Sequence, residues 1–188
     1  MFSVPTLIDI PPEFHSIEFD GPFQKCTICT TSLLDPETIY SIEKVYRGAE
    51  TILEMAVCLN CAMASSQELS EESLAVIQTE FEEKGNWQER MSWISECEEG
   101  ETPDPNRWLE RCVLTGEERS KLNGYQIGSS FQGDQMMLFR MPYLISASGV
   151  ASMAEKLSKK SQDYMRDFVE TNFGMPPELC DPPVPILM

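Results

Sequence analysis

Two Cys-x-x-Cys pairs lie in the segment KCTICTTSLLDPETIYSIEKVYRGAETILEMAVCLNCAMA, residues 25–64. The first pair is Cys26 and Cys29, and the second is Cys58 and Cys61. A two-residue spacing lets a tight turn direct both sulfur atoms at one point, and four thiolates complete the tetrahedral shell of a structural zinc ion. The pairs therefore predict one Zn²⁺ site formed by these four cysteines.

Other uses of the two pairs fit the sequence less well. A thioredoxin-like redox centre needs one such pair at the start of a helix, and it gives a second pair no role. Two disulfides require an oxidising compartment, which the rest of the chain does not favour. Iron is a variant of the same four-thiolate set. A catalytic zinc is not expected, because four thiolates leave no open position for water.

The residues between and after the pairs indicate a hairpin followed by a helix. Residues 37–46 and 51–57 are rich in Ile, Val, Tyr and Thr and are separated by the turn sequence RGAE at 47–50, which predicts a β-hairpin. Residues 58–85 follow a helical pattern. That pattern comprises a cap, an apolar face and a terminator, namely Ser70, then Leu74, Ile77 and Phe81, then Gly85.

This order of a Cys-x-x-Cys turn, a hairpin, a second Cys-x-x-Cys pair and a helix resembles a treble-clef zinc finger over about residues 24–85. The resemblance is architectural. It implies a fold and a structural metal, but it implies no particular activity, because many unrelated functions use this scaffold.

The second half of the chain repeats landmarks of the first half in the same order. The matching positions are Cys26 with Cys112, Cys29 with Thr115, Tyr40 with Tyr125, Gly48 with Gly133, and LSEES at 69–73 with LSKKS at 157–161. Counting from each glycine places Cys58 on Tyr143 and Cys61 on Ser146. We interpret the match as an internal duplication, with chance similarity between two small segments as the alternative.

The second copy keeps one of the four ligands and is expected to hold no metal. We expect Cys112, Thr115, Tyr143 and Ser146 to lie together at the position of the first copy's zinc, with the Tyr143 ring filling the volume of metal and sulfur. Apolar packing would stabilise this copy. The residues expected in that packing are Met137, Phe139, Tyr143 and Ile145, followed by the helical pattern Leu157, Ser161, Tyr164, Met165 and Phe168.

These observations predict an α+β fold built from two hairpin-plus-helix, treble-clef-like units, the second of which lacks metal ligands. The expected organisation has five parts. They are an N-terminal Pro-rich segment (1–23), a zinc-binding unit (24–94), an acidic linker (95–109), a degenerate metal-free repeat (110–175) and a Pro-rich C-terminal tail (176–188).

Three cysteines and the single histidine stand outside the two pairs. Cys97, Cys112 and Cys180 have no close-spaced partner, so free or buried thiols are expected. A second metal site made from them with His15 is the alternative. His15 lies in a Pro-rich segment and is expected at the surface.

Charge and hydropathy limit the kinds of partner. The 188-residue chain carries 14 Lys and Arg against 31 Asp and Glu, a net charge of −17, which disfavours direct binding of nucleic acid or an anionic membrane surface. The acidic surface serves solubility or attracts a basic protein. No apolar run reaches the length of a membrane span and the N-terminus has no signal-peptide pattern, so a cytoplasmic protein is expected.

The sequence predicts a function by binding rather than by catalysis. It has no Gly-rich phosphate loop, no G-x-S-x-G elbow and no His-Glu-x-x-His motif. We therefore expect an acidic cytosolic protein with one structural zinc that acts as a protein-interaction or adaptor module. The alternatives are a regulator or inhibitor that covers a basic surface of a partner protein, and an unrecognised enzyme with its pocket between the two units.

Overall fold

Six strands form one antiparallel sheet in the computed structural model, which describes residues 5–97 and 101–174. The order is β1-β5-β4-β2-β3, and β6 also pairs with β4. The strands are β1 (Thr6–Asp9), β2 (Ile39–Arg47), β3 (Glu50–Cys58), β4 (Gly124–Gln132), β5 (Gln135–Leu138) and β6 (Tyr143–Ser146). The helices are α1 (Leu59–Glu68), α2 (Glu71–Lys84), α3 (Trp87–Ser95), α4 (Ala147–Ala154) and α5 (Lys159–Phe173). The predicted α+β class is confirmed.

The hairpin between the two cysteine pairs forms as predicted. Strands β2 and β3 pair from Tyr40↔Cys58 to Arg47↔Glu50, with a bulge near Tyr46. Gly48 begins the two-residue turn with a φ of +59°, a backbone conformation that residues with a side chain rarely adopt. The hairpin therefore places Cys58, the last residue of β3, opposite Tyr40 near the start of β2.

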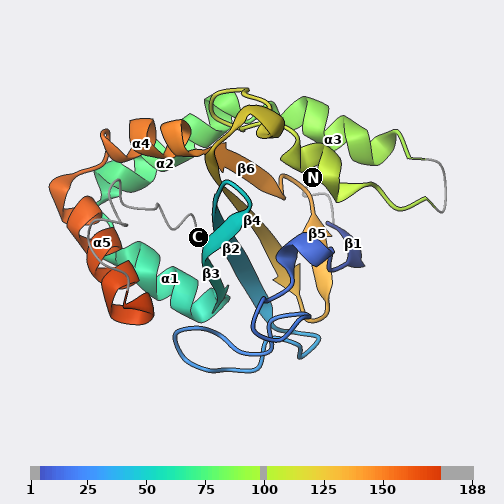
Figure 1. The fold of residues 1–188 in the computed structure, drawn as a ribbon, viewed down its shortest axis with the longest axis horizontal. Helices are drawn as coiled ribbons and strands as arrows, with labels where there is room; N and C mark the ends of the chain where they lie inside the picture. Colours follow the sequence, from blue (N-terminus) through green and yellow to red (C-terminus); the bar gives the residue numbers. More distant parts are fainter. Residues whose placement is uncertain (1–4, 98–100, 175–188) are drawn as a thin grey trace.

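The helical stretch after the second cysteine pair is divided into two helices. Helix α1 starts directly after β3, and α2 starts after Ser70, whose side chain accepts a hydrogen bond from the Ser73 amide. Ile77 and Phe81 pack against the core, whereas Leu74 is 37% exposed and does not belong to the buried face. Figure 1 shows α1, α2, α4 and α5 gathered at the left of the view and the edge strand β1 at the right.

The two units meet at a pseudo-twofold axis in the middle of the sheet. Strand β2 pairs with β4 along its whole length, and Glu43 lies opposite Gly128 at the centre of the pairing. Two stacked aromatic pairs flank this centre at similar distances. They are Tyr40 with Phe131, with ring centroids 5.3 Å apart, and Tyr46 with Tyr125, with ring centroids 4.9 Å apart.

The same symmetry appears where helices α2 and α5 begin. Their N-cap residues, Ser70 and Ser158, have hydroxyls 2.8 Å apart. The Ser70 amide donates to the Ser161 hydroxyl at 2.9 Å, and the Ser158 amide donates to the Ser73 hydroxyl at 2.9 Å. In an ordinary capping box the third residue of a helix accepts from its own N-cap amide. Here each helix supplies that acceptor to the other, which joins the two units.

The second hairpin differs from the first in its return strand. Where β3 has a bulge, the second unit has three additional residues, and the strand is split into β5 and β6 by residues 139–142. Side chains alternate between the two faces of a strand, so inserting an odd number of residues changes which of the later ones face the core. The prediction that Met137, Phe139, Tyr143 and Ile145 are all buried is therefore partly wrong. Met136 and Leu138 are fully buried, whereas Met137 and Phe139 are half-buried. Tyr143 and Ile145 are buried, as expected.

The N-terminal segment is part of the sheet and not only a Pro-rich extension. Strand β1 pairs with β5, from Thr6↔Leu138 to Asp9↔Gln135. Phe14 is fully buried with its ring edge toward Phe131, at a centroid distance of 5.4 Å. This segment therefore closes an edge of the second unit that would otherwise expose unpaired backbone groups.

The described part of the expected acidic linker also contains packed structure. Pro105–Leu109 forms a 3₁₀ turn in which Trp108 and Leu109 are buried. Arg90 of α3 is 5% exposed and donates to the Trp108 carbonyl oxygen at 3.3 Å, and burial lowers the pKa of its guanidinium to about 10. The Arg90 hydrogen bond thus holds helix α3 against this turn. The expected C-terminal tail, 176–188, lies outside the described residues.

We predict that Ser73→Ala and Ser161→Ala destabilise the protein to a similar extent, by about 1–3 kcal/mol each. Each hydroxyl is fully buried, and its removal leaves the N-cap amide of the opposite helix without an acceptor. Urea unfolding measures both free energies. Ser66→Ala is the control, because the Ser66 hydroxyl only adds a bond to a helical carbonyl of Met63. A loss confined to one of the two buried serines would contradict the reciprocal arrangement.

Candidate metal centre

The four paired cysteines meet in one place. Their Sγ atoms all lie within 4.8 Å of one another. Cys29 Sγ and Cys58 Sγ are 3.6 Å apart, and sulfur atoms 2.3 Å from a tetrahedral zinc would be separated by about 3.8 Å. Cys26 and Cys58 are buried, Cys61 is half-buried and Cys29 is exposed. The cluster therefore has the size and the donor atoms of a tetrahedral thiolate site at the edge of the protein.

The first cysteine turn is held by backbone bonds around Cys26. The Cys26 amide donates to the Thr31 carbonyl at 2.9 Å, and the Thr30 amide donates to the Cys26 carbonyl at 2.9 Å. Thr30 has a φ of +62°, which closes the turn. The Thr27 amide donates to the Ala56 carbonyl at 2.8 Å, which fastens the turn to β3. This bond brings the first pair next to the second.

The second pair is placed by the start of a helix. Cys58 is the N-cap of α1, and its amide donates to Cys26 Sγ at 3.4 Å. Cys61 follows one turn later, so its sulfur lies on the same side as that of Cys58. The end of β3 and the first turn of α1 therefore present two thiols to the two thiols of the first turn.

The four thiols differ in their acidity. Hydrogen bonds from the side chain and backbone of Thr31 lower the pKa of the Cys29 thiol to about 6. Burial raises the pKa of the Cys58 and Cys61 thiols. A cation bound among the sulfurs would favour the thiolate form of all four, because metal binding displaces thiol protons.

The second unit builds the same turn without a metal shell. The Cys112 amide donates to the Glu117 carbonyl at 2.8 Å, the Gly116 amide donates to the Cys112 carbonyl at 2.8 Å, and Gly116 has a φ of +74°. The Ser146 amide donates to Cys112 Sγ at 3.2 Å, as the Cys58 amide does to Cys26 Sγ. The Thr115 amide also donates to Cys112 Sγ, at 3.3 Å. Cys112, Thr115 and Ser146 therefore lie together, as expected.

The expected place of Tyr143 in this group is wrong. Its hydroxyl donates to Glu43 Oε1 at 2.9 Å, and its ring lies against Gly128 and Phe81 in the centre of the protein. Tyr143 precedes Ser146 by three positions in β6, so the two side chains leave the strand on opposite faces. Counting equal numbers of residues from Gly48 and Gly133 paired Cys58 with Tyr143. That pairing is wrong because the second hairpin has three additional residues between Gly133 and the end of β6.

Two of the residues outside the pairs have their own surroundings. Cys97 Sγ lies 3.5 Å from the Trp93 carbonyl, and His15 is half-buried with Nε2 3.2 Å from the Ile10 carbonyl. Within residues 5–97 and 101–174, the only group of three or more Cys, His, Asp or Glu side chains that could share an ion is the four-cysteine cluster. The alternative second site with Cys97, Cys112 and His15 does not form there, and Cys180 lies outside the described residues.

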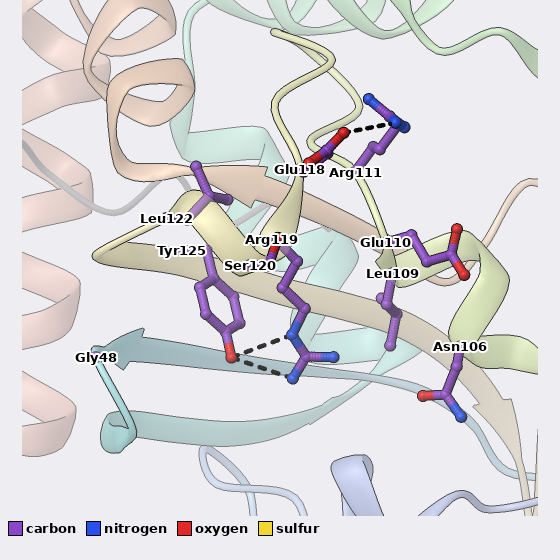
Figure 2. Close-up of a pocket in the computed structure, with 10 residues that line it drawn as sticks. All are labelled: Gly48, Asn106, Leu109, Glu110, Arg111, Glu118, Arg119, Ser120, Leu122 and Tyr125. Atoms are coloured by element: carbon purple, nitrogen blue, oxygen red, sulfur yellow. Dashed lines mark hydrogen bonds and ion pairs between the residues drawn. The ribbon is translucent and has the colours of Figure 1, made fainter.

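An open pocket of about 630 Å³ is formed by residues 106–125 together with Gly48 of the first hairpin turn (Figure 2). Its walls come from the end of the 3₁₀ turn 105–109, the segment 110–122 and the start of β4, and the first hairpin contributes Gly48. The Arg119 guanidinium donates to the Tyr125 hydroxyl at 3.1 and 3.3 Å, and Arg111 pairs with Glu118 at 2.9 Å. The lining contains no cysteine or histidine, so the cavity offers neither residue as a nucleophile or a base.

Comparisons of the chain with models of protein families, with curated proteins and with solved structures find no match. Among the helices of the described residues, none has the length and the apolar composition required to cross a membrane.

Proposed function

We propose that Cys26, Cys29, Cys58 and Cys61 bind one structural Zn²⁺ ion and that the surface around this site docks another protein. The observation that supports a metal is that the four Sγ atoms lie within 4.8 Å of one another. Thiolates select zinc or iron, and four of them fill a tetrahedral shell. Such a closed site stabilises the turn, the hairpin and the first turn of α1 against one another.

The docking surface consists of three exposed apolar side chains on and beside the metal ligands. Ile28 lies between the first two cysteines, Leu59 lies between the second two, and Met63 lies one helical turn after Leu59. They are 37%, 46% and 51% exposed. Because residues 59 and 63 share a helix face and residue 28 adjoins the same four sulfurs, we name these three residues the apolar patch.

Comparison with the second unit supports a role for the apolar patch. At the position of Ile28 the second unit has Leu114, which is 9% exposed, and at the positions of Leu59 and Met63 it has Ala147 and Ala151. The same backbone therefore needs no large exposed apolar groups for its own stability. Clusters of such groups on a surface are typical of protein-interaction sites.

The net charge of −17 indicates the chemistry of the partner. An acidic surface attracts basic groups and repels acidic ones. We infer that the partner presents an apolar segment flanked by Lys or Arg, as a basic protein would. In this proposal the apolar contacts supply affinity, and the charges supply the rate of association and the choice of partner.

Zinc analysis tests the metal. We predict about one Zn²⁺ per chain in freshly purified protein, and loss of the metal from Cys61→Ser because one of four ligands is removed. Cys97→Ser is the matched control and should keep the ion, since Cys97 lies apart from the cluster. Elemental analysis by mass spectrometry gives the stoichiometry. Equal zinc content in both variants would show that the cluster is not the metal site.

Peptide selection tests the docking surface. We predict that peptides selected from a random library on the zinc-loaded protein combine apolar residues with Lys or Arg. The double substitution Leu59→Ser/Met63→Ser should weaken their binding by more than about tenfold, because it removes the apolar contacts. Leu74→Ser is the control, since Leu74 is an exposed leucine on α2 and not part of the patch.

Titration at low and high salt separates the proposed function from its alternative. Binding that persists at high salt and depends on the apolar patch supports docking through apolar contacts. Binding that disappears at high salt and is the same in Leu59→Ser/Met63→Ser would instead support a regulator that uses only its acidic surface to cover a basic partner.

A further inference from the structure

The start of helix α4 identifies which residues of the second unit correspond to the second cysteine pair. Cys58 and Ser146 each end a return strand and form the N-cap of the following helix, with φ and ψ of −66° and 155° in one case and −68° and 155° in the other. Each amide donates to the sulfur of the first cysteine of its turn, Cys26 or Cys112. Ser146 is therefore the counterpart of Cys58.

This correspondence makes Gly149 the counterpart of Cys61, because both are the third residue of their helices. The Gly149 amide donates to the Ser146 hydroxyl at 3.1 Å. A Cβ atom placed on Gly149 would lie 3.5 Å from Cys112 Sγ and 3.3 Å from Ser146 Oγ. A side chain at position 149 would thus point into the cluster, as the fourth ligand must.

The polar groups of the second cluster bond to each other. The Ser146 hydroxyl donates to Cys112 Sγ at 3.3 Å, and it lies 2.9 Å from the Ser148 hydroxyl. The Thr115 and Ser148 hydroxyls both donate to Glu117 Oε2, at 2.8 and 3.1 Å. These hydrogen bonds link the turn at Cys112 to the start of α4. In an intact four-thiolate site, a metal would make this link.

We propose that the second unit is a former zinc site in which Cys112 is the one remaining ligand and Thr115, Ser146 and Gly149 stand where the other three thiolates were. Its backbone still has the form of the first site, so restoring three thiols restores metal binding. The inference rests on the proposed function in one respect: the first site is taken as the example of what the intact ligand set does.

The test is the triple variant Thr115→Cys/Ser146→Cys/Gly149→Cys, purified under reducing conditions with wild-type protein beside it. We expect zinc to rise from about one to about two ions per chain, since the variant supplies a second four-thiolate set. With Co²⁺ in place of zinc, the absorption bands of tetrahedral thiolate coordination should roughly double. Adding Cys112→Ser should weaken the second ion by more than about tenfold, because losing a direct ligand costs at least as much as losing an outer-shell partner.

The space at position 149 calls for a second variant. The added Cβ would approach Ile145 Cγ2 at 3.1 Å, so this neighbour must move by a few tenths of an ångström. Thr115→Cys/Ser146→Cys leaves Gly149 unchanged and supplies three thiols with Cys112. If the triple variant does not fold, this double variant must bind a second ion, detected by its Co²⁺ absorption bands. A folded triple variant with no more metal than the wild type would overturn the inference. So would a folded double variant with no second ion, where the triple variant does not fold.

A background with Cys26→Ser/Cys29→Ser separates this inference from the proposed function. In that background the triple variant should hold about one zinc, all of it in the second unit. If the wild type holds no zinc while the triple variant holds one, the proposed first site fails and the former site stands. If the wild type holds one ion and the triple variant with Cys26 and Cys29 intact also holds only one, the proposed first site stands and the former site fails.

Discussion

The pairing of β2 with β4 determines how the two units are placed. It joins the two units through an unbroken antiparallel ladder and sets their pseudo-twofold relation, with Glu43 opposite Gly128 at its centre. Once these strands are paired, each return strand and its helix must lie on the outer side of its own unit. The reciprocal caps of α2 and α5 then form a second contact between the two units, through Ser70, Ser73, Ser158 and Ser161. The protein is therefore one body built from two similar halves.

The two halves close the same turn in different ways. In the first, four sulfur atoms converge as a metal site requires, and a structural zinc contributes about 10–16 kcal/mol to a folded finger. In the second, the bonds among Cys112, Ser146, Thr115 and Glu117 each contribute about 0.5–1.5 kcal/mol, which is far less in total. The second half compensates with apolar packing: Leu114, which lies in its turn, is buried, whereas its counterpart Ile28 is exposed. A metal bound in the first half, as proposed, would leave that half free to present an apolar surface.

The elements set by local sequence could be predicted. Two-residue cysteine spacing, β-branched strands around Gly48 and the cap at Ser70 each have a local physical cause, and the structure has the hairpin and the cap in these places. Features that depend on distant contacts could not be predicted in this way. Strand β1 acquires its role only through its pairing with β5, and the buried Trp108 packs against Trp93 of α3 and accepts hydrogen bonds from Arg90. The place of Tyr143 could not be predicted because composition does not reveal an odd number of additional residues inside a strand. Such an insertion moves each later side chain of the strand to the opposite face. The helix N-cap was the more reliable landmark, because LSEES and LSKKS start their helices in the same way.

The proposed function requires that Cys26, Cys29, Cys58 and Cys61 form one closed tetrahedral metal shell. X-ray absorption at the zinc edge of the purified protein tests it most directly, because it reports the identity of the neighbouring atoms and their distances from the metal. We expect four sulfur neighbours at about 2.3 Å and no nitrogen or oxygen bound to the metal. A first shell that includes nitrogen or oxygen, or protein that takes up no zinc under reducing conditions, would contradict it.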